Sequence, residues 1–163
     1  MGPRLEGILL ALLVGAAPGV ARTAPPGCSG TLSGSVTGKF ACEVSVTTGE
    51  GGSAFLVIAP TTRVDGVPSL VPGSFEVTGL LAPGTYRLAD LGMGKAAVAA
   101  EGGTLYTATR TTGQRGEVTL VFSKVEKGAN GKGTPVVRGT YRARLLPAGG
   151  GKTGEVVVEV KFQ

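Results

Sequence analysis

The chain has 163 residues, of which 42% are hydrophobic and 17% are charged, and its formal net charge is +5. This length suits one globular domain with its own core. The chain has no histidine and only two cysteines, which excludes Ser-His-Asp and Cys-His catalytic sites, histidine-bound zinc or haem, and four-cysteine metal clusters. We therefore expect neither a metal nor a cofactor.

The N-terminal region has the pattern of a secretory signal peptide. Residues 8–17, ILLALLVGAA, are apolar and uncharged, and Arg4 precedes them. The run is well short of the roughly 20 residues needed to span a bilayer. Small residues follow and offer a cleavage site after Ala21. We expect a signal peptide over 1–21, a linker over 22–27 and one exported domain over 28–163.

Cys28 and Cys42 are fourteen positions apart, and three interpretations of them remain open. In an exported chain two cysteines most simply form a disulfide. Alternatively, Cys28 is the lipidated cysteine of a bacterial lipoprotein; Gly27 fits the position before it, but Pro25 and Pro26 do not fit the positions further upstream. Lipidation of Cys28 and a Cys28–Cys42 bond exclude each other. Failing both, the two thiols are small buried hydrophobic groups.

After the signal segment, apolar residues alternate with period two or form short runs between glycines, as in β-strands. The run 54–59, AFLVIA, is typical of a strand buried on both faces, and 95–101, KAAVAAE, fits one helical turn or an edge strand. We expect an all-β, antiparallel sandwich, or a barrel-like variant of it, with eight or nine strands. The other expected strands are 30–36, 39–47, 74–78, 85–89, 105–110, 118–125, 136–146 and 155–162.

The last two predicted strands carry the best candidate ligand site. Period-two alternation places Arg138, Arg142 and Arg144 on one outward face, with Lys161 on the neighbouring strand if the final hairpin forms. Guanidinium groups bind carboxylates and sulfates well, so this face is a candidate for an acidic glycan or peptide. The alternative is that cross-strand pairs neutralise the arginines. Those pairs would come from Glu155 and Glu159.

Other motifs carry weaker signals. Residues 149–153, GGGKT, resemble the end of a phosphate-binding loop, but Leu146 stands where that motif needs glycine and a valine-rich strand follows. The segment 92–95, GMGK, is a lone GxG that we interpret as a turn. Asp65 and Asp90 are isolated in turn-like contexts, unlike the clustered ligands of calcium sites. Lys and Arg are scattered, which argues against a nucleic-acid partner.

Glycosidase chemistry needs two carboxylates at a defined separation in a cleft. The candidate glutamates occupy mostly polar positions of predicted strands, where a solvated face is the simpler explanation. They are Glu43, Glu76, Glu117, Glu155 and Glu159.

Residues 73–80, GSFEVTGL, and 83–88, PGTYRL, together resemble a stretch found in several extracellular bacterial β-sandwich families. The later segments 116–120, 137–141 and 154–156 and the terminal Phe162 are similar to the end pattern of secreted or lipoprotein-type β-sandwich domains of unknown function. These shared residues occupy turns and core positions. The resemblance implies an exported all-β domain and no particular reaction.

The sequence therefore predicts an exported, non-enzymatic structural or binding module of the bacterial envelope or exterior. It would be periplasmic, outer-membrane-associated or extracellular. Its expected partner is an envelope polysaccharide or another exported protein, with membrane attachment only if Cys28 is lipidated. Two alternatives are an acidic glycan- or peptide-binding module using the arginine face, and a small hydrolase or protease inhibitor.

Overall fold

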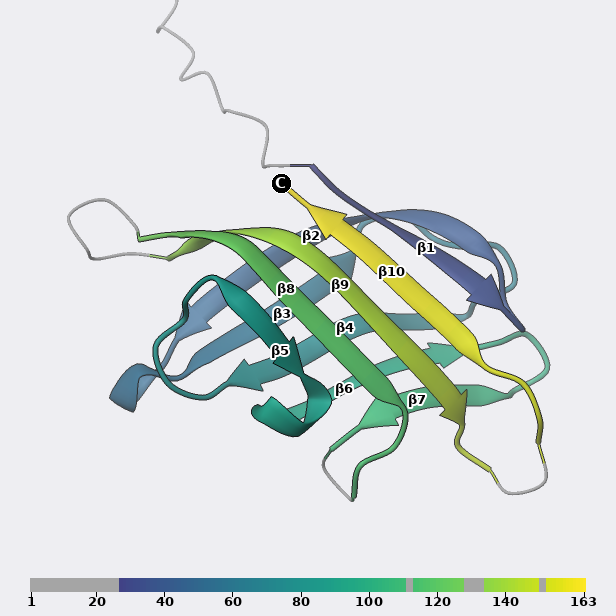
Figure 1. Cartoon of the computed structure of the whole chain (residues 1–163). Helices are drawn as coiled ribbons and strands as arrows, with labels where there is room; N and C mark the ends of the chain where they lie inside the picture. The colour runs from purple at the N-terminus through teal and green to yellow at the C-terminus, as the bar shows by residue number, and fades with distance from the viewer. Residues whose placement is uncertain (1–26, 111–112, 128–133, 150–151) are drawn as a thin grey trace, which may run out of the picture.

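The computed structural model describes residues 27–110, 113–127, 134–149 and 152–163 (Figure 1). The predicted signal peptide and nearly all of the predicted linker lie outside these residues. The described part contains ten strands and two short 3₁₀ segments. The strands are β1 Cys28–Gly34, β2 Gly38–Thr48, β3 Ala54–Pro60, β4 Ser69–Val77, β5 Gly84–Arg87, β6 Leu91–Ala99, β7 Leu105–Thr109, β8 Glu117–Glu126, β9 Val136–Pro147 and β10 Val156–Phe162, and the 3₁₀ segments are Glu50–Gly52 and Leu88–Asp90.

Eight of these strands form a closed antiparallel barrel, in the order β10-β1-β2-β3-β4-β6-β7-β9, which the β9–β10 pairing closes. Strand β8 pairs with β9 as far as Arg144, so only Leu146 and Pro147 of β9 are left to pair with β7. Strand β5 extends the sheet from the far side of β8. In Figure 1 strands β5, β8, β9, β10 and β1 lie in front of β3, β4, β6 and β7. The all-β antiparallel prediction is confirmed, in its barrel-like form.

The barrel interior is filled by alternate side chains from every strand except β5, whose Tyr86 packs against the core, half-buried. On β10 the inward set is Val156, Val158, Val160 and Phe162, as the alternation predicts. Aromatic rings occupy the centre. Phe75 packs on Tyr141 with ring centroids 5.7 Å apart, and Phe122 packs edge-on against Phe162 at 6.2 Å. Burial of this apolar surface is the main term that stabilises the fold.

Three local predictions were wrong, one of which is the turn expected at residues 92–95, because these residues belong to strand β6. The run 54–59 is not buried on both faces, because β3 alternates and the Phe55 side chain is 43% exposed. The segment 95–101 is neither helical nor an edge, because β6 pairs with β4 on one side and β7 on the other. Within the described residues, no helix is long and apolar enough to cross a membrane.

Candidate functional site

The first and second strands are joined by a disulfide. Cys28 and Cys42 lie directly opposite each other on β1 and β2, and their sulfur atoms are bonded. Both side chains are buried, at 9% and 7% exposure. The predicted disulfide is therefore present. While this bond exists, the Cys28 sulfur cannot carry a lipid thioether.

The β9–β10 register decides which of the predicted arginines have acidic partners. Arg142 lies opposite Glu159, with 3.2 Å between Nε and Oε1. Arg144 Nε donates to Glu155 Oε2 at 2.5 Å, and Arg144 Nη1 lies 3.6 Å from Glu117 Oε1. The hydrogen bond and charge of Glu155 raise the pKa of the Arg144 guanidinium. Both arginines thus form the cross-strand pairs that the sequence allowed.

A groove of about 950 Å³ crosses the outer face of the sheet from β2 to β8. The strand registers arrange its outward residues in two rows that run across the strands. One row is Ala41, Ser29, Lys161, Thr140 and Val121, and the other is Lys39, Thr31, Glu159, Arg142 and Thr119. Thr62 lines the groove beside β2, where its Oγ1 accepts a hydrogen bond from the Ala41 amide at 2.8 Å.

Among the described residues that line it, the groove carries three cationic side chains and one carboxylate. Arg142 is paired with Glu159, whereas neither Lys39 nor Lys161 forms an ion pair with any residue that the structure describes. Lys161 has Ser29 on one side and Thr140 on the other as its direct cross-strand neighbours. A site at Lys161 therefore combines one ammonium group with two hydroxyl groups.

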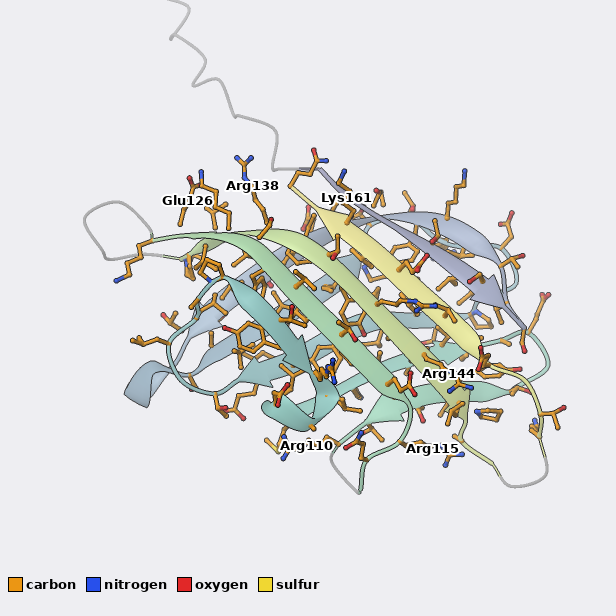
Figure 2. The ribbon with its side chains drawn as sticks, viewed as in Figure 1. Arg110, Arg115, Glu126, Arg138, Arg144 and Lys161 are labelled. Carbon is orange, nitrogen blue, oxygen red and sulfur yellow. A yellow bond between two sulfur atoms is a disulfide. The ribbon has the colours of Figure 1, made fainter. Side chains whose placement is uncertain are left out.

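A second, smaller groove of about 350 Å³ continues from the first, and the two share Val121, Thr140 and Lys161. It adds Arg138, which precedes the residue that pairs with Phe162. Figure 2 shows Arg138 and Lys161 at the end of the sheet where the chain ends, and Arg144 at the opposite end. Of the four predicted site residues, Arg142 and Lys161 lie together in the first groove. Arg138 adjoins them, and Arg144 lines neither groove.

Sequence reasoning missed the part of the groove that β1 and β2 contribute, including Lys39, Ser29 and Thr31. These residues are far from β9 and β10 in the chain and reach the site only because β1 pairs with β10. The alternation of β2 placed Lys39 on the polar face. No local sequence pattern indicated that β1 would pair with β10 and so bring this polar face beside β9 and β10.

Aromatic side chains do not form a binding platform in the groove. The chain has five phenylalanines, three tyrosines and no tryptophan, and all eight aromatic residues are described. Only Phe40 and Tyr141 border the groove, and both point into the barrel, at 3% and 1% exposure. The groove therefore offers hydroxyl groups and charges to a ligand, and no exposed ring.

The remaining sequence candidates have structural roles where they are described. Residues 92–95 belong to strand β6 and form no turn-like nucleotide loop. Asp90 Oδ2 accepts a hydrogen bond from the Arg87 amide at 2.9 Å, and Asp65 lies in a turn. The glycine-rich segment 149–153 falls partly outside the described residues. Among the residues described, no cluster of His, Cys, Asp or Glu is arranged to hold a metal ion.

One polar group inside the barrel has no hydrogen-bond partner. The Tyr141 hydroxyl is fully buried and unpaired within the described structure. Burial raises the pKa of the Tyr141 phenol well above its usual value, because a phenolate would have to form without water around it. This hydroxyl points into the core, away from the groove.

Comparison of the chain with protein-family models, with curated proteins and with solved structures gave no match. The chemistry of the site therefore has to be argued from its own geometry. The groove offers hydrogen bonds from a set of hydroxyl groups and attraction from two ammonium groups. Its one carboxylate already has an arginine partner.

Proposed function

We propose that this protein is an exported, non-enzymatic binding module of the bacterial envelope or exterior that holds an extended polymer in its outer-face groove. The observation that carries the proposal is the groove itself, which spans five neighbouring strands. The strands that form it each pair with a neighbouring strand on both sides. A preformed surface of this kind binds a polymer without first having to be ordered.

Export is supported by two independent features. The apolar run at residues 8–17 has the length and flanks of a signal peptide. The Cys28–Cys42 disulfide is of a kind that persists in oxidising compartments and is rare in the cytosol. The resemblance to secreted bacterial β-sandwich domains points in the same direction.

Binding is favoured over catalysis because the carboxylates on this face of the sheet are paired with arginines and exposed to water. Glu159, Glu155 and Glu117 each lie within ion-pair distance of an arginine, so the oxygen atoms of each carboxylate already have a cationic partner. The carboxyl group of a general acid instead typically lies in an apolar pocket or beside a second carboxyl group. The side chains of all three glutamates are also more than 40% exposed, so water has free access to them.

A groove-filling substitution tests the proposal. Thr140→Trp places a bulky ring in the groove, whereas Val157→Trp places the same ring on the same sheet face beside Arg144, outside it. Retention on immobilised acidic and neutral polysaccharides is the measurement. We expect wild type and Val157→Trp to be retained on at least one polymer and Thr140→Trp to be released. Retention on none, or equal retention of both variants, would contradict the proposal.

The export part has its own test, the intact mass of the protein produced in a bacterium that secretes it. We expect a mass that starts at Arg22 and lacks the two hydrogens of a disulfide. A mass that retains residues 1–21, or one that carries an acyl modification at Cys28, would overturn this part.

A further inference from the structure

We propose, on the basis of the binding function above, that the polymer is an acidic polysaccharide and that Lys39 and Lys161 bind its anionic groups. The arginine cluster that the sequence singles out would then stabilise the sheet and would not be the main ligand contact. Lys39 is on β2 and Lys161 on β10, with β1 between them.

The charge balance of the groove supports an anionic ligand. Arg142 and Glu159 cancel each other at 3.2 Å, which leaves the two ammonium groups of Lys39 and Lys161 as the uncompensated charge. Arg138 adds a further cation in the adjoining groove. The whole chain is also basic, with a net charge of +5. Such a field attracts a polyanion and raises its rate of association.

The arginines are poorer ligand contacts than their number indicates. Arg144 already has Glu155 and Glu117 as partners, and Arg142 has Glu159. An anion that bound either guanidinium would have to displace a carboxylate or approach it closely. The ammonium group of Lys161, between the hydroxyl groups of Ser29 and Thr140, carries no such competition.

The neutral part of the groove fits sugar hydroxyl groups. Its outward side chains include five hydroxyls, each able to donate and to accept a hydrogen bond. They belong to Ser29, Thr31, Thr62, Thr119 and Thr140. Because no exposed ring lines the groove, single-stranded nucleic acid would lack the stacking on which its binding depends.

A peptide fits this surface less well than a glycan. Extended peptides commonly bind by adding a strand to a free sheet edge, where their main chain can form hydrogen bonds. The groove lies on the face of β2, β1, β10, β9 and β8, whose backbone groups pair with neighbouring strands. The free edge of the described sheet is at β5, which does not line the groove.

Calorimetric titration with four probes tests the inference: alginate oligosaccharides, dextran sulfate, dextran and polyglutamate. We expect binding of alginate or dextran sulfate that weakens as salt is added, and much weaker binding of dextran and polyglutamate. Lys39→Gln and Lys161→Gln should each weaken binding roughly three- to fivefold, and the double variant more than tenfold. Lys95→Gln on β6 removes the same charge outside the groove and should bind like wild type, as should Arg144→Gln.

The outcomes separate the two proposals. Dextran binding as tight as that of the acidic glycans, insensitive to Lys161→Gln, would overturn the anionic ligand and leave the groove as a glycan site. Polyglutamate binding as tight as alginate binding would replace the polysaccharide by an acidic peptide. Loss of alginate binding in Arg144→Gln but not in Lys161→Gln would restore the arginine cluster as the site. Binding of none of the four probes would remove the inference and the proposed function together.

Discussion

Arg142 of β9 and Glu159 of β10 face each other directly across the sheet, with 3.2 Å between the guanidinium Nε and the carboxylate Oε1. Two residue pairs further along, on the same face of the sheet, the same register sets Lys161 opposite Thr140, which is not an acid. One hairpin register thus divides a basic face into a paired half and an unpaired half. Exposed pairs such as Arg142–Glu159 contribute only about 0.2–1 kcal/mol to stability. Their main effect here is that the paired arginine is less available to a ligand, whereas the unpaired lysines stay available.

The disulfide is expected to contribute substantially to stability. In the chain-entropy model, a cross-link that closes a loop of about 15 residues stabilises the fold by roughly 3 kcal/mol. The double variant Cys28→Ala/Cys42→Ala should therefore lower the free energy of unfolding by about that amount in urea denaturation. Wild type treated with a reductant is the control and should lose a similar amount. Equal urea midpoints for oxidised and reduced wild type would contradict this role.

Gly139 is required by the close approach of two strands. A Cβ at this position would lie 1.9 Å from the Val121 carbonyl oxygen, and that contact is with backbone, which cannot rotate away. Gly139→Ala should therefore lower the free energy of unfolding by about 1–3 kcal/mol. Gly149→Ala is the matched control, because a Cβ there has nothing within 4 Å. Equal urea midpoints for the two variants would refute the steric argument.

Period-two alternation was sufficient to assign the faces of β8, β9 and β10 correctly, because one face of each is core and the other is solvent. It failed at residues 54–59, where small and large apolar residues on both faces hid the fact that Phe55 is half-exposed. It also failed at β6, whose alanines and glycines have low strand propensity. There the pairing with β4 and β7 overrides the local preference.

The Tyr141 hydroxyl should make the protein sensitive to alkali. Its pKa is raised in the folded state, so above about pH 10 the unfolded chain loses this proton while the folded chain retains it. Stability therefore falls as pH rises above about 10 and is unaffected by this group below that value. Tyr141→Phe removes an unpaired buried hydroxyl and should be at least as stable as wild type at neutral pH. Urea denaturation of both proteins at pH 7 and above pH 10 measures the difference. A steeper alkaline loss in Tyr141→Phe than in wild type would contradict this account.

Arg115 should stabilise the narrowest junction of the barrel. In the part of the sheet that the structure describes, two residue pairs join β7 to β9. The Arg115 guanidinium donates hydrogen bonds to the carbonyl oxygens of Pro147 and Ala148 beside them. Arg115→Met should lower stability by about 1–2 kcal/mol, because these bonds have a charged donor. Hydrogen exchange should accelerate at β7 and the end of β9 before it does elsewhere. Uniform acceleration over the sheet, or none, would show that the junction does not depend on Arg115.

The candidate site was predictable only in part, because it combines both ends of the described chain. Arg138, Arg142 and Lys161 could be found from the alternation of two adjacent strands. Ser29 and Lys39 could not, because the β1–β10 pairing joins residues more than 120 positions apart in the sequence. The Cys28–Cys42 disulfide was one of three interpretations that the sequence left open, and the structure shows which of them holds.

The most direct test of the groove as an acidic-glycan site is a map of backbone amide shifts during titration of the ¹⁵N-labelled protein with alginate oligosaccharides. We predict that the largest changes fall on β1, β9 and β10, at Ser29, Thr140 and Lys161 and at the residues paired with them. The amides around Phe55 and Met93 should be unaffected, because neither residue lines the groove. Changes centred on those two residues, or a titration without any localised change, would contradict the central claim.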